Sequence, residues 1–319
     1  PATAATVSSY GPNEGLPELR EALRAKVATQ NGLSGHNICV THGANQAFVN
    51  LVLTLVDAKD RVVLFKPAYF DHLMTITQTG GADNIVWGEC DPHTLHPDIT
   101  WLRGAMSGPS PPKLVVICNP CNPTGVLLSK GELEEISNIC AQAGAWLVVD
   151  ETYEDFVWGW AGASDPGSSS SSSTAPQEPP AHHCVCAPHV VHLFSFSKAY
   201  GMMGWRVGYV AYWDPDGRDV TGIGGGLLKC QDTVCICAGQ LSQHVALAAL
   251  KHGGEYKGRM VESLRGNRQL LLDALSPLGS LGDGSIAGGE GGLYFWARLP
   301  PGCEDDGKTV EWLGGHAGV

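Results

Sequence analysis

Lys198 is the residue in this sequence whose position best suits covalent chemistry. It follows the apolar run Val190–Phe196 and precedes a glycine-containing turn. A lysine shielded from water beside other cations has a lowered pKa, so its neutral amine can attack an aldehyde. Ser195 and Arg206 bracket Lys198 with a hydroxyl and a fixed cation, which suit a phosphate dianion. The alternative is an ordinary lysine at a strand end with its amine in solvent.

Two further polar side chains follow a second apolar run. Asp150 comes directly after Ala145–Val149, and Tyr153 lies three residues later. A carboxylate buried there needs a cationic partner, and a protonated pyridine nitrogen would provide one while keeping the ring an electron sink. Tyr153 could then donate a hydrogen bond to a phenolic oxygen on the same ring. The alternative for Asp150 alone is a helix N-cap.

Asn122 and Tyr69 each lie close to proline. Asn122 stands between Pro120 and Pro123, after the strand predicted over Leu114–Cys118, and prolines in a turn present the amide rigidly. Tyr69 follows Pro67 and offers an aromatic plane that could stack on a flat ring. The alternatives are simple turn chemistry for Asn122 and ordinary packing for Tyr69.

A glycine-led helix start offers a second anion site. Gly43-Ala44-Asn45 opens a predicted helix directly after a short apolar strand. The free backbone amides of Ala44 and Asn45, together with the positive end of the helix dipole, suit a phosphate group. A single helix start of this kind is weak evidence when it stands alone.

The elements that must position these residues alternate between strand and helix. Near-continuous apolar strands favour an α/β fold with a mostly parallel sheet covered by helices on both faces. In such sheets ligands bind at the carboxyl ends of the strands, where the polar residues lie. The predicted strands cover residues 37–41, 61–65, 114–118, 145–149, 190–196, 206–212 and 293–297, and the predicted helices cover residues 14–30, 46–56, 130–143 and 258–275.

Three parts make up the predicted organisation. Residues 1–33 form an N-terminal segment with the first helix, and residues 34–255 form the large domain. Residues 256–319 read as an incomplete, smaller α+β domain. The serine- and proline-rich stretch 162–180 cannot bury apolar surface, which predicts a disordered insertion in the large domain. We also expect Gly222–Gly226 to form a flexible loop.

The net charge and the cysteine content indicate which partners and which compartment to expect. Lys and Arg total 20 against 32 Asp and Glu, for a net charge of −12. This excess argues against nucleic acid or an anionic membrane as the main partner. Eleven irregularly spaced cysteines read as reduced thiols, which favours the cytoplasm. The chain begins with Pro1 rather than Met, so an organellar transit peptide stays open.

The order of the motifs resembles that of one enzyme family. Gly-Ala-Asn, Pro-x-Tyr, Asn-Pro-Thr-Gly, Asp-x-x-Tyr, Ser-x-x-Lys and an arginine eight residues after the lysine follow one another. This order resembles the fold-type I, class I/II aminotransferases, which depend on pyridoxal 5′-phosphate. The segments at residues 9–20, 43–51 and 194–206 are most similar to plant aromatic and methionine aminotransferases linked to auxin and ethylene metabolism.

The resemblance implies a role for each matching residue. Lys198 would form the Schiff base with pyridoxal phosphate and shuttle a proton. Asp150 would pair with the pyridinium nitrogen, while Tyr153 and Asn122 would bond its phenolic oxygen. The phosphate would be held by Ala44, Asn45, Ser195 and Arg206, with Tyr69 stacked on the ring and Tyr10 reaching in from the neighbouring subunit of a homodimer.

The implied reaction transfers an amino group between an aromatic amino acid or methionine and a 2-oxo acid. A C–S β-lyase, an aminocyclopropane-carboxylate-type synthase and a non-catalytic pyridoxal-phosphate-binding remnant are the alternatives. Arg298 does not match the family's substrate-binding arginine, which we expect beyond Val319. We therefore expect this chain to bind cofactor poorly and to turn over slowly or not at all. Cys121 replaces the usual small or polar residue between the Asn-Pro pairs, and we expect no loss of chemistry from it.

No metal ligands are assigned from the sequence. His182, His183, Cys184 and Cys186 lie close together after the serine-rich stretch. They have no second ligand pair at a standard spacing, so we interpret them as incidental.

Overall fold

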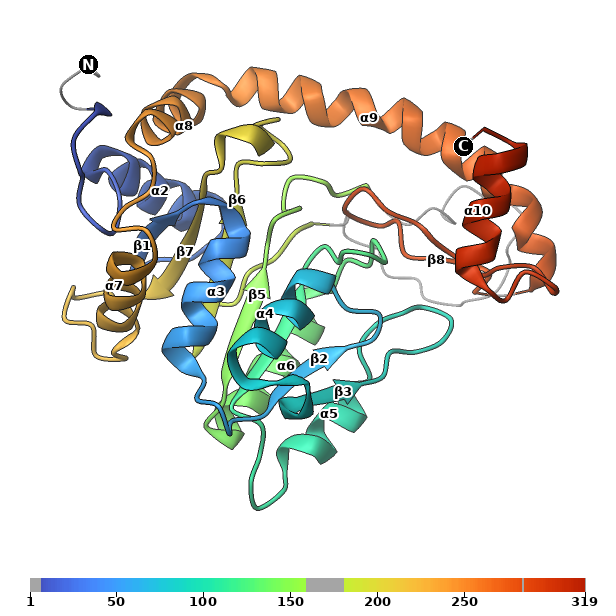
Figure 1. Cartoon of the computed structure of the whole chain (residues 1–319), viewed down its shortest axis with the longest axis horizontal. Coiled ribbons are helices and arrows are strands. Elements are labelled where there is room, and N and C mark those ends of the chain that lie inside the picture. The colour runs from blue at the N-terminus through green and yellow to red at the C-terminus, as the bar shows by residue number, and fades with distance from the viewer. Residues whose placement is uncertain (1–6, 159–180, 283, 319) are drawn as a thin grey trace, which may run out of the picture.

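A seven-stranded sheet forms the centre of the computed structural model (Figure 1), which describes residues 7–158, 181–282 and 284–318. The strand order is β1-β7-β6-β5-β4-β2-β3. Strand β7 runs antiparallel to both of its neighbours, and all other pairs are parallel. The strands are β1 (His36–Thr41), β2 (Val62–Phe65), β3 (Ile85–Gly88), β4 (Leu114–Cys118), β5 (Trp146–Asp150), β6 (Val190–Ser195) and β7 (Gly208–Trp213).

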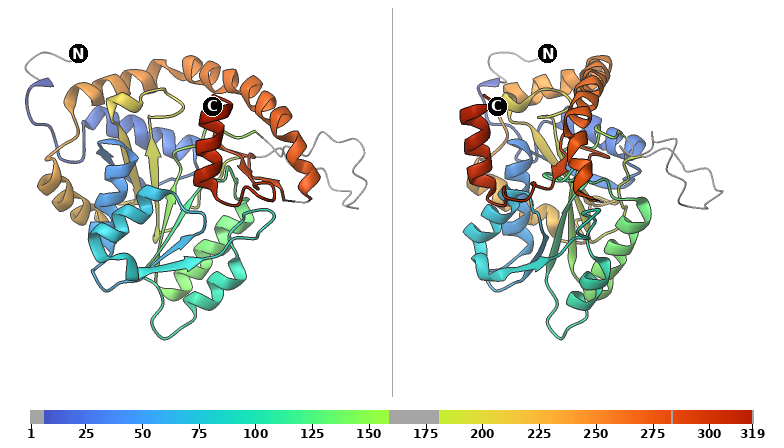
Figure 2. Two further views of the ribbon diagram at one scale, coloured as in Figure 1. Left: turned by 45° about the vertical axis from the view of Figure 1, so that its right-hand side comes forward. Right: turned by 90° about the vertical axis from the view of Figure 1, so that its right-hand side faces the viewer.

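Helices cover both faces of this sheet (Figure 2). One face packs on α3 (Gly43–Leu55), α4 (Phe70–Gly80) and α7 (Ile223–Val234). The other face packs on α2 (Pro17–Gln30), α5 (Ile99–Met106), α6 (Lys130–Ala143) and α8 (Gln240–His252). Because side chains alternate along a strand, Val62 and Leu64 join the first core while Val63 and Phe65 join the second. The predicted α/β fold is confirmed.

The C-terminal part begins with the long helix α9 (Gly254–Leu275), which runs from α8 to the far side of the molecule (Figure 1). It is followed by η3 (Ser276–Leu281), the short pair β8 (Ile286–Ala287) and β9 (Trp296–Ala297), and α10 (Asp306–His316). Two further 3-10 turns are η1 (Ala82–Asn84) and η2 (Met203–Trp205). Among the described residues, no helix combines the length and apolar character needed to cross a membrane.

Several sequence-based expectations need correction. Residues 222–226 were expected to form a loop, but Ile223 begins α7. Arg206 was placed in a strand, but its φ is +51° and β7 starts only at Gly208. The strand expected over residues 293–297 is reduced to Trp296–Ala297. The predicted insertion at 162–180 lies entirely outside the described residues.

Candidate active site

A cavity of about 350 Å³ lies at the carboxyl ends of the central strands. Parallel strands bring these ends to one edge, and β4, β5 and β6 each deliver polar side chains there. Nine of the ten predicted site residues line this cavity, namely Ala44, Asn45, Tyr69, Asn122, Asp150, Tyr153, Ser195, Lys198 and Arg206. The structure therefore brings together residues that are separated by more than 160 positions in the sequence.

One end of the cavity suits an anion. Helix α3 begins at Gly43 and directs its first backbone amides at this end. The guanidinium of Arg206 donates a 2.9 Å hydrogen bond to the carbonyl oxygen of Met203. A Cβ on Gly43 would lie 2.3 Å from Arg206 Nη2, so only glycine lets the helix start and the cation lie this close. Among the described residues, no carboxylate lies within 4.0 Å of Arg206.

The opposite end carries a buried carboxylate. Asp150 is only 7% exposed, and its Oδ2 lies 3.2 Å from Nε2 of His72 on α4. Its Oδ1 accepts a 3.0 Å hydrogen bond from the backbone N–H of Thr152. Two fixed partners hold the carboxylate in one orientation, with room for a cationic partner from the cavity.

Lys198 and two tyrosines lie between these ends. The Nζ of Lys198 is 5.7 Å from the centre of the Tyr153 ring. The hydroxyl of Tyr153 lies 2.5 Å from that of Tyr294. Burial and this hydrogen bond raise the pKa of Tyr153 well above its usual value, so the phenol keeps its proton at neutral pH and can act as a donor.

Tyr69 stands at the start of α4 and forms one wall of the cavity. Its ring meets that of His72 edge to face, with centroids 5.2 Å apart. Burial, with smaller contributions from Asp71 and Asp150, raises the pKa of Tyr69 to about 12. The ring is thus a neutral aromatic surface held in place by its neighbours.

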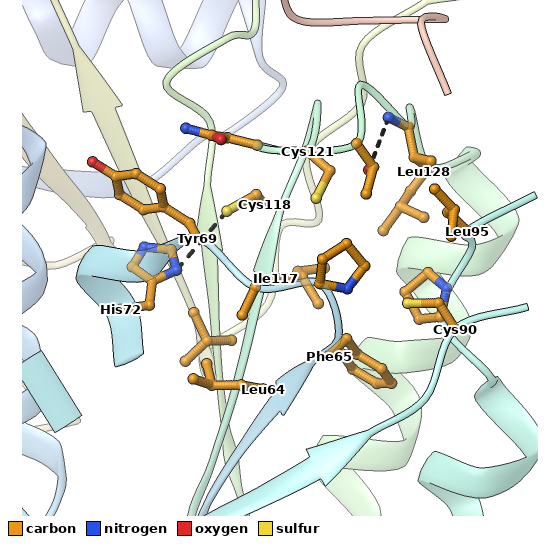
Figure 3. A pocket seen from close by; sticks show the side chains of 17 residues that line it. Leu64, Phe65, Tyr69, His72, Cys90, Leu95, Ile117, Cys118, Cys121 and Leu128 are labelled. Carbon is orange, nitrogen blue, oxygen red and sulfur yellow. Dashed lines mark hydrogen bonds between the residues drawn. The ribbon is translucent and has the colours of Figure 1, made fainter. Parts of the chain in front are cut away.

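A second, mostly apolar cavity lies directly behind this wall (Figure 3). Tyr69, His72 and Cys118 lie at one end of it, and Cys90 and Leu95 lie at the other (Figure 3). Its volume is about 40 Å³, against about 350 Å³ for the cavity that Lys198 lines. The larger cavity is therefore the candidate site.

Tyr10 is the one predicted residue that does not line the site. Its side chain is 81% exposed and lies beside a different surface depression, formed with Cys235 and Cys237. The role expected for it concerns a neighbouring subunit and stays a prediction.

Sequence reasoning missed His72 and Tyr294. His72 lies three residues after Tyr69 on α4, which places both on one face of the first turns, so helical spacing could have revealed it. Tyr294 gave no such signal, because its position depends on a tertiary contact. The segment before it sits on the Asn-Pro-Thr-Gly turn, where Gly291 N–H donates to the carbonyl oxygen of Gly125 at 2.9 Å.

Known proteins resemble this chain over most of its length. A family model described as aminotransferase class I and II matches residues 2–310. The aromatic aminotransferase ISS1 of Arabidopsis thaliana is 44% identical over 98% of this chain and 73% of its own length. An aspartate aminotransferase of Thermotoga maritima is 26% identical over 95% of this chain and 72% of its own length.

Solved structures agree with this relationship. An aminotransferase from Mycobacterium tuberculosis superposes with a TM-score of 0.80 at 26% identity, covering 98% of this chain and 73% of that one. The aromatic aminotransferase from Pyrococcus horikoshii gives a TM-score of 0.79 at 26% identity, with 98% and 78% coverage. The chain thus belongs to the class I and II aminotransferases and is a pyridoxal phosphate-dependent transaminase.

Proposed function

We propose that this transaminase uses an aromatic amino acid or methionine as its amino donor and a 2-oxo acid as its acceptor. The observation that carries this proposal is the shortage of charge around the cavity. Among the described lining residues only Asp150, Lys198 and Arg206 are charged. Each of the three would contact the cofactor. No cation is left there for an acidic side chain, whereas Phe70 and Met203 offer apolar surface.

The donor groups of the cavity fit pyridoxal phosphate from end to end. At the anion end, the backbone of Ala44 and Asn45, the Ser195 hydroxyl and the guanidinium of Arg206 would hold the phosphate. Arg206 suits a dianion because no carboxylate of the described chain neutralises it. The Ser195 hydroxyl already accepts a 3.0 Å hydrogen bond from the N–H of Ser197, which fixes its orientation.

The ring would lie between Tyr69 and the strand ends. Asp150 would pair with the ring nitrogen, and Asn122 and Tyr153 would bond the ring hydroxyl. When bound, pyridoxal phosphate supplies an aldehyde for amines and a ring that withdraws electrons from the substrate Cα. Lys198 would hold the cofactor covalently and, once released, its Nζ would take the proton from Cα and return it one carbon away.

A homodimer would complete this site. Phe70 and Met203 line the cavity yet are 66% and 57% exposed, and Trp205 beside them is 43% exposed. Exposed aromatic and apolar side chains at the mouth of a site are typical of a covered interface. Tyr10 of one subunit would then reach the phosphate of the other. Sedimentation should give twice the mass of the chain, and Tyr10→Phe should weaken cofactor binding.

A donor panel tests the substrate class. Purified protein with pyridoxal phosphate would be given phenylalanine, tyrosine, tryptophan, methionine, aspartate or alanine, with 2-oxo acids as acceptors. Aromatic donors or methionine should have the highest kcat/KM, and preference for aspartate would contradict the proposal. Release of ammonia with pyruvate, instead of amino transfer, would point to the C–S lyase alternative.

A pair of lysine variants tests the anchor. Lys198→Ala should lose transamination and should no longer be labelled when the protein is treated with borohydride and cofactor. Lys229→Ala is the matched control, because Lys229 is exposed on α7 and does not line the cavity. Transamination by Lys198→Ala at the rate of the control would refute the role of Lys198. The cytoplasm stays the proposed compartment.

A further inference from the structure

A buried cluster of metal-ligating side chains lies outside the cofactor cavity. Glu151 follows β5 directly and is completely buried. Its Oε2 lies 2.7 Å from His182 Nε2, and its Oε1 lies 3.4 Å from Cys184 Sγ. The three ligand atoms lie within 4.8 Å of one another. None of these three residues lines the cofactor cavity.

Strand geometry explains how the cluster forms. Successive side chains of an extended chain point in opposite directions, so Asp150 faces the cavity while Glu151 faces the other way. The segment over residues 181–187 forms neither helix nor strand, and His182 and Cys184, two residues apart, both turn toward Glu151. Neither His183 nor Cys186 joins the cluster, since Cys186 donates instead to the carbonyl oxygen of Ser34.

We propose that Glu151, His182 and Cys184 bind a zinc ion. Carboxylate, imidazole and thiolate are the ligand types that zinc takes in proteins, at about 2.0–2.3 Å. Ligands of a tetrahedral ion at those bond lengths lie roughly 3.3–3.6 Å apart. The 3.4 Å separation of Glu151 Oε1 and Cys184 Sγ lies in that range, whereas the 2.7 Å separation of Glu151 Oε2 and His182 Nε2 is a direct contact. Glu151 and His182 must therefore move apart to admit the ion.

A supporting shell is already present. Nδ1 of the buried His192 lies 2.8 Å from Glu151 Oε1, and its Nε2 lies 3.0 Å from the carbonyl oxygen of Val185. A hydrogen-bonding partner behind a ligating carboxylate orients it and tunes the metal. The same histidine therefore holds both Glu151 and the segment that carries the other two ligands.

The chemistry of the three side chains suits a dication at this place. The Glu151 carboxylate and a Cys184 thiolate would together neutralise a Zn²⁺ ion, and a neutral His182 imidazole would be the third ligand. Binding of the ion would release the Cys184 proton to solvent.

Cobalt reports directly on such a site. Protein carrying pyridoxal phosphate would be stripped of metal with a chelator under reducing conditions and then titrated with Co²⁺. One Co²⁺ per chain should produce a thiolate-to-cobalt charge-transfer band and tetrahedral visible bands, and Zn²⁺ should abolish both. Absence of the charge-transfer band in this protein would overturn the proposal.

Matched neighbours provide the controls. Cys184→Ser should remove the charge-transfer band, and His182→Gln should weaken Co²⁺ binding by at least the roughly 10- to 100-fold that loss of a supporting partner costs. Cys186→Ser and His183→Gln should bind Co²⁺ like the unaltered protein. A band that survives in Cys184→Ser would assign the metal elsewhere and refute the site.

X-ray absorption keeps the test independent of how the variants fold. The zinc-loaded, unaltered protein should show a single sulfur ligand at about 2.3 Å with nitrogen and oxygen ligands at about 2.0–2.2 Å. Two sulfur ligands would point to another cysteine pair, such as Cys235 and Cys237, and would contradict the proposal. Only nitrogen and oxygen ligands would contradict it as well.

Discussion

Replacing His72 should weaken cofactor binding although His72 need not touch the cofactor. Its Nε2 lies 3.2 Å from Asp150 Oδ2, and both side chains are at least 90% buried. His72→Leu removes this contact while Asp150 keeps the bond from the Thr152 N–H. A hydrogen bond to a charged group contributes about 1.5–3 kcal/mol, which corresponds to roughly a 10- to 150-fold change in an equilibrium constant.

The expected loss of affinity comes from the orientation of the Asp150 carboxylate. In the proposed complex Asp150 pairs with the pyridinium nitrogen, so its carboxylate must point into the cavity while His72 holds it from the other side. Without His72 the carboxylate can rotate, so part of the binding energy goes into fixing it again. The His72 ring also packs on Phe48 with centroids 4.2 Å apart, so leucine should lower the melting temperature modestly as well.

Titration of the apoprotein with pyridoxal phosphate, followed by absorbance, measures the effect. His72→Gln should restore part of the affinity, because the amide nitrogen can reach a similar position. His189→Leu is the matched control, since His189 bonds the Ser137 carbonyl oxygen at 2.9 Å away from the cavity and should change only stability. An affinity of His72→Leu within twofold of the unaltered protein would refute this reasoning.

Three further predictions concern the parts that frame the site. Gly43→Ala, at φ +81° and 2.3 Å from the guanidinium at the phosphate end, should cost about 1–2 kcal/mol and weaken pyridoxal phosphate binding roughly 5- to 30-fold by titration; unchanged affinity would contradict it. Glu132→Gln should lower stability in thermal scans by at most about 1 kcal/mol, mainly between about pH 4.5 and 6.5. Burial opposes the charged form of Glu132, but the bond with His96 lowers the pKa of Glu132 to about 2, so the stabilisation by this carboxylate is lost as the pH falls from 4.5 toward 2. The same bond raises the pKa of His96, so the stabilisation by the pair is also lost as the pH rises through the pKa of His96 in the folded protein. A difference between the two proteins that does not depend on pH would refute the pairing. Gly125→Ala, at φ +75° and 2.3 Å from the backbone of the C-terminal segment, should lower the free energy of unfolding by about 1–3 kcal/mol in urea titrations. Gly131→Ala, a helical glycine with open space around it, should be neutral or stabilising, and equal effects of the two would argue against the close approach.

The sequence predicted the cavity well where strands are continuously apolar. The runs at β4, β5 and β6 carry almost no polar residue, so their ends, and with them Asp150 and Lys198, could be located without a structure. The short β3 was missed because four residues carry little periodic signal. Helix α4 was missed too, and with it His72, because threonines interrupt its apolar face.

Helix α7 shows why local propensity failed. Three glycines in its first turns disfavour a helix in an isolated chain. The Asp219 carboxylate accepts from the Gly224 and Gly225 N–H groups at 2.8 Å and 2.7 Å, which fixes the helix start. A Cβ on Gly226 would lie 2.3 Å from Thr54 on α3, so packing of the two helices requires glycine there. The glycines do have a low helix propensity, but contacts with Asp219 and with α3 stabilise the helix in the folded protein.

Asp150 and Glu151 show why spacing along the sequence is not enough to predict every site. Adjacent residues in an extended backbone face opposite sides, so one carboxylate belongs to the cofactor cavity and the next belongs to the histidine and cysteine cluster. The histidines and cysteines at 182–186 looked incidental because no ligand pair stands at a standard distance from them. Their third partner lies 31 residues before His182, on the far side of the Ser-rich stretch, and only the sheet brings it to them. The cluster of Glu151, His182 and Cys184 can therefore be identified only from the three-dimensional structure, whereas the residues around Lys198 could be predicted from sequence motifs alone.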